Sequence, residues 1–169
     1  GATLNTTSLK KRNFLISGVI VALTLNMLSN GILLLFMKFI LKMNLFTEIK
    51  YSLIFIILGN LFGISLGLFV GASNKQSVGV KTMISIMIML ILSFLSGLMS
   101  PDIKVMIDKK FPTLDKINPV SAISSNLYRI NLLKNTKGIG NGMLLLIFYS
   151  ILLLLGSYLF LRRQNYDSV

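Results

Sequence analysis

Four long apolar runs constrain this chain more than any other feature of its sequence. None contains Asp, Glu, Lys or Arg, and they cover residues 14–37, 51–71, 82–99 and 141–161. About 20 apolar residues in a helix span the roughly 30 Å hydrocarbon core of a bilayer. Because backbone groups in lipid must be hydrogen-bonded internally, each run is expected to form a helix. The sequence therefore predicts an all-α integral membrane protein with about four transmembrane helices, in a domain over residues 14–161.

The composition excludes several classes of function. Charged residues make up 13% of the chain, against about a quarter in soluble domains. There is no Cys and no His, which removes disulfides, Cys- or His-based catalysis and the usual zinc sites. The net charge of +12 would suggest nucleic acid in a soluble protein, but here basic residues flank the apolar runs, where they anchor helices among lipid headgroups. We expect no catalytic residue, no cofactor or metal bound by this chain, and no nucleic-acid partner.

The segments outside the runs predict a topology. Because each span crosses the membrane once, the connecting segments alternate between its two sides. The basic segment 1–13, the loop 72–81 and the tail 162–169 are therefore expected on the same side. That side carries seven Lys or Arg residues, and the other carries three if residues 100–137 are left out, which favours a cytoplasmic N-terminus. With residues 100–137 included the second count rises to ten, so charge alone leaves the orientation open. The abundance of Lys, Asn and Ile without Trp is typical of AT-rich bacteria, and we expect a bacterial plasma membrane.

The long segment 100–137, between the third and fourth spans, carries two helix-start patterns. Ser100-Pro101-Asp102 combines an N-cap residue, a proline in the first turn and an acid near the positive end of a helix. Asn118-Pro119 repeats the device, and apolar residues follow both at helical spacing. The sequence predicts two short amphipathic helices, external or re-entrant, with Pro101, Asn118 and Pro119 marking the turns.

The second run carries a row of glycines four residues apart, namely Gly59, Gly63, Gly67 and Gly71. Such a row allows close backbone packing between membrane helices. We expect packing against a sister helix of the same chain, and the alternative is a dimer contact or a moving surface.

Three amide side chains lie within the apolar runs. Asn26 and Asn30 share one face of the first run, and Asn60 lies in the second. An interhelical hydrogen bond in lipid contributes about 0.6 to 2 kcal/mol, so these residues are expected to hold helices together. The alternative is that they line a polar translocation path.

Motifs for nucleotide or ion chemistry are missing from the sequence. No Gly-rich loop ends in Gly-Lys-Ser/Thr, so the chain is not expected to cradle ATP phosphates in the P-loop manner. Gly138, Gly140 and Gly142 lack a preceding strand and are interpreted as a flexible start to the last span. The absence of ionisable residues from all four runs argues against ion-coupled transport.

Four stretches together resemble permeases of type-2 ABC exporters. Residues 6–14 resemble the segment before the third span of that family, and residues 61–75 its fourth span and following loop. Residues 94–101 and 117–121 resemble its fifth span and its external Asn-Pro turn. The family usually has six spans, and this sequence begins just before the third. A fragment, one piece of a split permease and a shortened relative are all open at this point.

The resemblance implies a permease that works with cytoplasmic ABC ATPase subunits and exports a lipid-linked, peptide or drug-like substrate. ATP would be bound by the partner, and a second permease copy or missing N-terminal spans would complete the membrane part. The coupling candidates match the family's pre-span segment and are Thr7, Ser8, Leu9, Lys10, Lys11 and Arg12. Ordinary lipid anchoring explains these basic residues equally well.

Two rival hypotheses remain. A small non-transporting membrane protein, such as an immunity or accessory subunit, would bind a partner through the glycine row. A membrane-embedded enzyme would need paired acids, and only Asp102, Asp108 and Asp115 are candidates. These acids alternate with lysines as on a solvated helix face, so a membrane-embedded enzyme is the least favoured of the three hypotheses.

Overall fold

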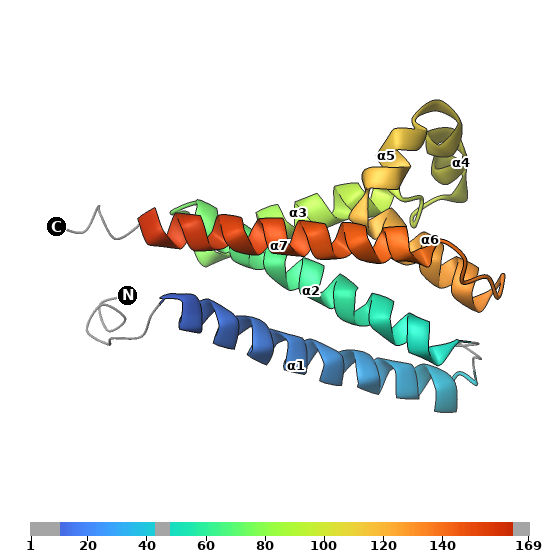
Figure 1. The fold of residues 1–169 in the computed structure, drawn as a ribbon, viewed down its shortest axis with the longest axis horizontal. Helices are drawn as coiled ribbons and strands as arrows, with labels where there is room; N and C mark the ends of the chain where they lie inside the picture. The colour runs from blue at the N-terminus through green and yellow to red at the C-terminus, as the bar shows by residue number, and fades with distance from the viewer. Residues whose placement is uncertain (1–10, 43–47, 164–169) are drawn as a thin grey trace.

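The computed structural model describes residues 11–42 and 48–163, and within these ranges the chain forms seven α-helices (Figure 1). They are α1 (Lys11–Phe39), α2 (Ile49–Ser73), α3 (Val78–Leu95), α4 (Pro101–Lys110), α5 (Pro112–Ile117), α6 (Pro119–Asn131) and α7 (Ile139–Arg163). Helices α1, α2, α3 and α7 are long and apolar enough to cross a membrane. The prediction of an all-α protein with about four membrane spans is confirmed.

The four long helices run side by side, and the three short ones gather at one end (Figure 1). The start of α1, the end of α7 and the connection between α2 and α3 lie together at the opposite end. The most extensive packing joins α2 to α7, while α1 lies against α2. This arrangement agrees with the expectation that the start of the first span, the loop between the second and third spans and the end of the fourth span lie on the same side.

The core lies where α2, α6 and α7 meet. Its buried members are Phe55, Phe62, Ile130, Ile139 and Leu146. The ring of Phe62 also meets the ring of Tyr149 edge to face, with 6.3 Å between centroids. Much of the apolar surface of α1 and α3 is exposed, and a bilayer accepts such surface without the cost it would have in water.

The third span ends earlier than expected. Helix α3 stops at Leu95, and Gly97 follows with a φ of +78°, a conformation that favours glycine. A Cβ at Gly97 would overlap the side chain of Lys104 on α4. The chain therefore turns at Gly97 so that α4 can fold back against the end of α3.

Three short helices occupy the segment in which two were expected. Each begins with a proline at its first position, where the missing N–H costs no hydrogen bond. Pro112 separates α4 from α5, because the residue before a proline is forced out of the helical conformation. Phe111 accordingly has a φ of −137° and a ψ of 57°.

Candidate functional site

An amide pair joins the first two spans near their middle. The Nδ2 of Asn30 on α1 donates to Oδ1 of Asn60 on α2 over 3.2 Å, and the Nδ2 of Asn60 donates to Sδ of Met27 over 3.5 Å. Asn26, which was grouped with Asn30 by helical spacing, is exposed. The structure thus brings together two of the three amides singled out in the sequence.

The amide pair lies at one side of a groove between α1, α2 and α6, with a volume of about 390 Å³. Except for the amides its lining is apolar, and consists of Leu33, Leu34, Met37, Phe55, Ile56, Gly59, Ile123 and Leu127. A groove with apolar walls and a single pair of amides suits an amphiphilic molecule better than an ion.

The glycine row packs within the chain only at its first member. A Cβ at Gly59 would lie 3.0 Å from Cδ1 of Ile123 on α6, whereas a Cβ at Gly63, Gly67 or Gly71 would meet nothing within 4 Å. The expected close packing of the whole row against a sister helix of the same chain is therefore not found. The buried face of α2 is turned toward α6 and α7. Four residues turn an α-helix by about 400°, which is about 40° more than a full turn, so each successive glycine of the row lies further from this face.

Close packing instead occurs at two glycines of α7. A Cβ at Gly156 would lie 2.8 Å from Cε2 of Phe69, and a Cβ at Gly142 would overlap the amide of Asn126. The interpretation of Gly142 as part of a flexible start to the last span is therefore incomplete, because α6 packs directly on it.

Four serines of α2 and α7 are buried, and none of them stood out in the sequence. Ser52, Ser65, Ser150 and Ser157 are almost fully buried. The hydroxyls of Ser65, Ser150 and Ser157 donate to the carbonyl oxygen four residues earlier, so each is satisfied without a partner on the other helix. Small residues of this kind let helix backbones approach closely. Ser150 and Ser157 are seven residues apart and share a face of α7, and this spacing was the available signal. Ser52 instead exchanges hydrogen bonds with Asn131 of α6.

Asn118 fixes the start of α6, directly after α5. Its Oδ1 accepts from the backbone N–H of Val120 over 2.9 Å, and its Nδ2 donates to the carbonyl of Leu92 on α3 over 2.8 Å. Pro119 and Pro101 occupy the first positions of α6 and α4. Asn118 thus caps one helix and holds it to the end of the third span.

Two of the three acids considered for catalysis, Asp108 and Asp115, form ion pairs with Lys104. The Nζ of Lys104 lies 3.2 Å from Oδ1 of Asp108 and also contacts Oδ1 of Asp115. This triad joins α4 to α5, which is a structural role. Within the described ranges no three His, Cys, Asp or Glu side chains gather closely enough to hold a metal ion.

The coupling candidates fall largely outside the described ranges. Thr7, Ser8, Leu9 and Lys10 precede residue 11, and Lys11 and Arg12 form the first residues of α1 without described side chains.

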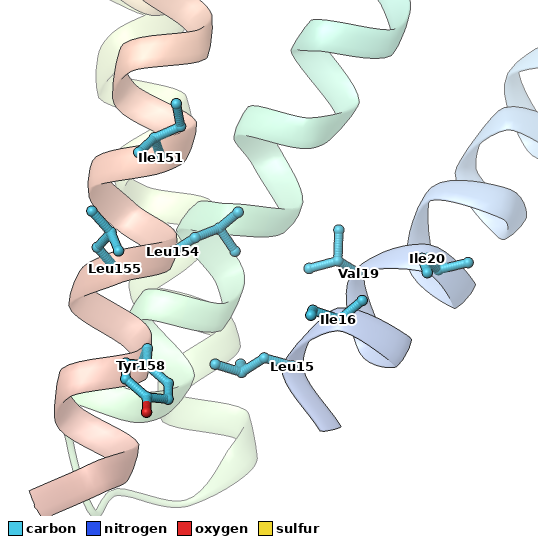
Figure 2. Close-up of a pocket in the computed structure, with 8 residues that line it drawn as sticks. All are labelled: Leu15, Ile16, Val19, Ile20, Ile151, Leu154, Leu155 and Tyr158. Carbon is cyan, nitrogen blue, oxygen red and sulfur yellow. The ribbon is translucent and has the colours of Figure 1, made fainter. Parts of the chain in front are cut away.

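A second groove lies between α1 and α7, close to where α1 begins and α7 ends (Figure 2). Leu15, Ile16, Val19 and Ile20 form one wall. Ile151, Leu154, Leu155 and Tyr158 form the other, and the volume is about 500 Å³.

These features define a helical membrane protein with four candidate spans and a cluster of short helices at one end. The chain matches the family described as ABC-2 family transporter protein over residues 2–159, and it belongs to that family. The resemblance to type-2 ABC permeases is thereby confirmed, and a multi-pass membrane transport subunit is the class this match supports. No curated protein and no solved structure matches the chain.

Proposed function

We propose that this chain is the permease part of an ATP-driven exporter in which a separate ABC ATPase hydrolyses the nucleotide. The observation that carries the proposal is membership of the ABC-2 family in a sequence without a P-loop. Because the sequence offers no loop to cradle ATP phosphates, the energy for transport comes from a partner subunit.

The ATPase docks at the end of the molecule where α1 begins and α7 ends, on the cytoplasmic side of a bacterial plasma membrane. Residues 7–12 form the docking segment, with Leu9 as its apolar contact and the basic residues around it. The charge count outside residues 100–137 supports this orientation. Helices α4 to α6 then face the outside.

The groove between α1, α2 and α6 forms part of the translocation path. Its apolar walls and the Asn30–Asn60 amide pair suit an amphiphile, which makes a lipid-linked, peptide or drug-like molecule the expected cargo. Further spans, from a second copy or from an N-terminal half, complete the path beside the exposed apolar faces of α1 and α3.

Co-purification tests the proposal. The tagged chain is expressed with an ABC ATPase encoded beside it and is extracted in mild detergent. A stable complex with the ATPase is the expected result. A correctly inserted chain that binds no ATPase would instead favour the non-transporting accessory protein.

A further inference from the structure

The groove between α1 and α7 is separate from the amide-containing groove and plays no part in the proposed path. Its walls are aliphatic except for Tyr158, and several lining side chains, including Ile20 and Leu155, are more than half exposed. Figure 2 shows Leu15 and Val19 of α1 pointing across the groove toward Leu154 of α7. In a membrane such a groove is open to the acyl chains of the bilayer.

Apolar walls alone do not select one lipid over another, because bilayer and groove are equally apolar for an acyl chain. Selectivity must come from the headgroup, and therefore from the polar groups at the membrane-surface end of the groove. The Tyr158 hydroxyl points toward that end (Figure 2). An aromatic ring with a polar tip is typical of the level of lipid headgroups.

The charges at this end of the molecule are all of one sign within the described ranges. Arg162 is exposed and lies four residues beyond Tyr158, on the same face of α7. Lys75 and Lys81 lie at the same end, in and beside the α2–α3 connection. The acidic residues of the described ranges, Glu48, Asp102, Asp108 and Asp115, all lie at the opposite end.

We propose that the groove between α1 and α7 binds an anionic phospholipid of the bilayer. One acyl chain lies between the aliphatic walls, and the phosphate group faces Arg162 and the Tyr158 hydroxyl. The lipid is a resident of the site and not the exported cargo. The inference goes beyond transport and is tested without an ATPase, so its failure would leave the proposed function unaffected.

Tryptophan fluorescence provides the test, because the chain contains no Trp. A Leu155→Trp variant places a reporter in the groove, and a Val19→Trp variant places one on the other wall in case the first does not fold. The matched control is Ile86→Trp on the exposed surface of α3. Leu155 and Ile86 each lie about two helical turns from the same end of the molecule, so depth in the bilayer is comparable.

Each variant is reconstituted in phosphatidylcholine bilayers that contain brominated phosphatidylglycerol or the same amount of brominated phosphatidylcholine. A basic residue near a membrane surface contributes about a five-fold preference for an anionic lipid. We expect relative binding constants from quenching to favour phosphatidylglycerol by about five-fold or more in the groove. The preference should be smaller at the control site on α3, whose Lys81 donates to the carbonyl of Gly71.

Charge variants in the Leu155→Trp background identify the headgroup contact. Arg162→Gln should lower the preference at least about two-fold. Lys50→Gln, at the opposite end of the molecule, should leave it unchanged. Equal quenching by both lipids in the groove, or an unchanged preference in Arg162→Gln, would overturn the proposal. Absence of quenching by either lipid would show that protein, such as a second copy, covers the groove, and this result too would overturn it.

Discussion

The amide of Asn30 donates to the amide oxygen of Asn60 over 3.2 Å, and this hydrogen bond links two spans that otherwise meet mainly through aliphatic side chains. Within lipid, water does not compete for such a bond, yet the unfolded chain in the membrane also finds partners, so the net contribution is modest. The pair nevertheless sets the register of α1 against α2. It also supplies the polar groups of the groove assigned to the cargo.

Replacing Asn30 with leucine should weaken the contact between α1 and α2. The Asn30→Leu variant loses the interhelical bond and should be less stable by about 0.6 to 2 kcal/mol. Unfolding in a mild detergent with increasing denaturant measures the change. Asn26→Leu is the matched control, since Asn26 is exposed on the same helix. An equal loss in both variants would show that the amide pair has no special role.

Glycine substitutions should separate packing within the chain from packing outside it. Gly156→Leu should destabilise the protein by about 1 to 3 kcal/mol, because its side chain would meet Phe69. Gly67→Leu should be tolerated within about 0.5 kcal/mol, since the exposed Gly67 has no neighbour at the Cβ position. Thermal unfolding of the two variants in detergent measures this contrast. The reverse order of stabilities would contradict the packing of α2 on α7.

Gly67→Leu also tests the alternative use of the glycine row. If the row forms a contact between copies, the variant should keep its stability as a single chain but lose self-association, as measured by cross-linking in bilayers. Unchanged association would exclude the row from a dimer interface.

The ion-paired Lys104 should hold α4 against α5. Lys104→Met removes the contacts with Asp108 and Asp115, and we expect faster amide hydrogen exchange over residues 101–117, corresponding to about 0.5 to 1 kcal/mol for a partly exposed pair. The control is Lys109→Met on the same helix, at an exposed position. Similar exchange in both variants would mean that apolar contacts alone hold these helices.

Cysteine labelling tests the orientation, and a chain without Cys makes it direct. Ser77 and Thr113 are both exposed, at opposite ends of the molecule. In intact cells an impermeant thiol reagent should label Thr113→Cys and leave Ser77→Cys unlabelled until the membrane is permeabilised. The opposite pattern would place α4 to α6 in the cytoplasm.

The sequence was sufficient for the existence of the four spans and for two of the three short-helix starts. Charge-free runs of about 20 residues have few alternatives to a membrane helix, and prolines at 101 and 119 begin helices for a local reason. The packing faces were less predictable. The glycine row was conspicuous, but which face of α2 is buried depends on where α6 and α7 lie, and only Gly59 meets a neighbour.

Apart from the Asn30–Asn60 bond, the contacts between distant segments had no local signal. The bond from Asn118 to the carbonyl of Leu92 and the contact of Phe69 with Gly156 both join segments far apart in the sequence. Likewise, the meeting of α1 with α7 in the second groove depends on the path of the chain through the membrane. Such features require the three-dimensional arrangement.

The central claim is that this chain couples to a separate ATPase through residues 7–12, and Leu9→Asp tests it most directly. This variant alters the apolar docking contact without changing the Lys and Arg count that orients the spans. The measurement is ATP hydrolysis by the co-purified ATPase in bilayers, with insertion of the chain checked in parallel. We predict that the wild-type chain stimulates hydrolysis and that Leu9→Asp reduces the stimulation at least about ten-fold, because a buried unpaired charge costs several kcal/mol. Wild-type stimulation by a correctly inserted Leu9→Asp chain would contradict the account.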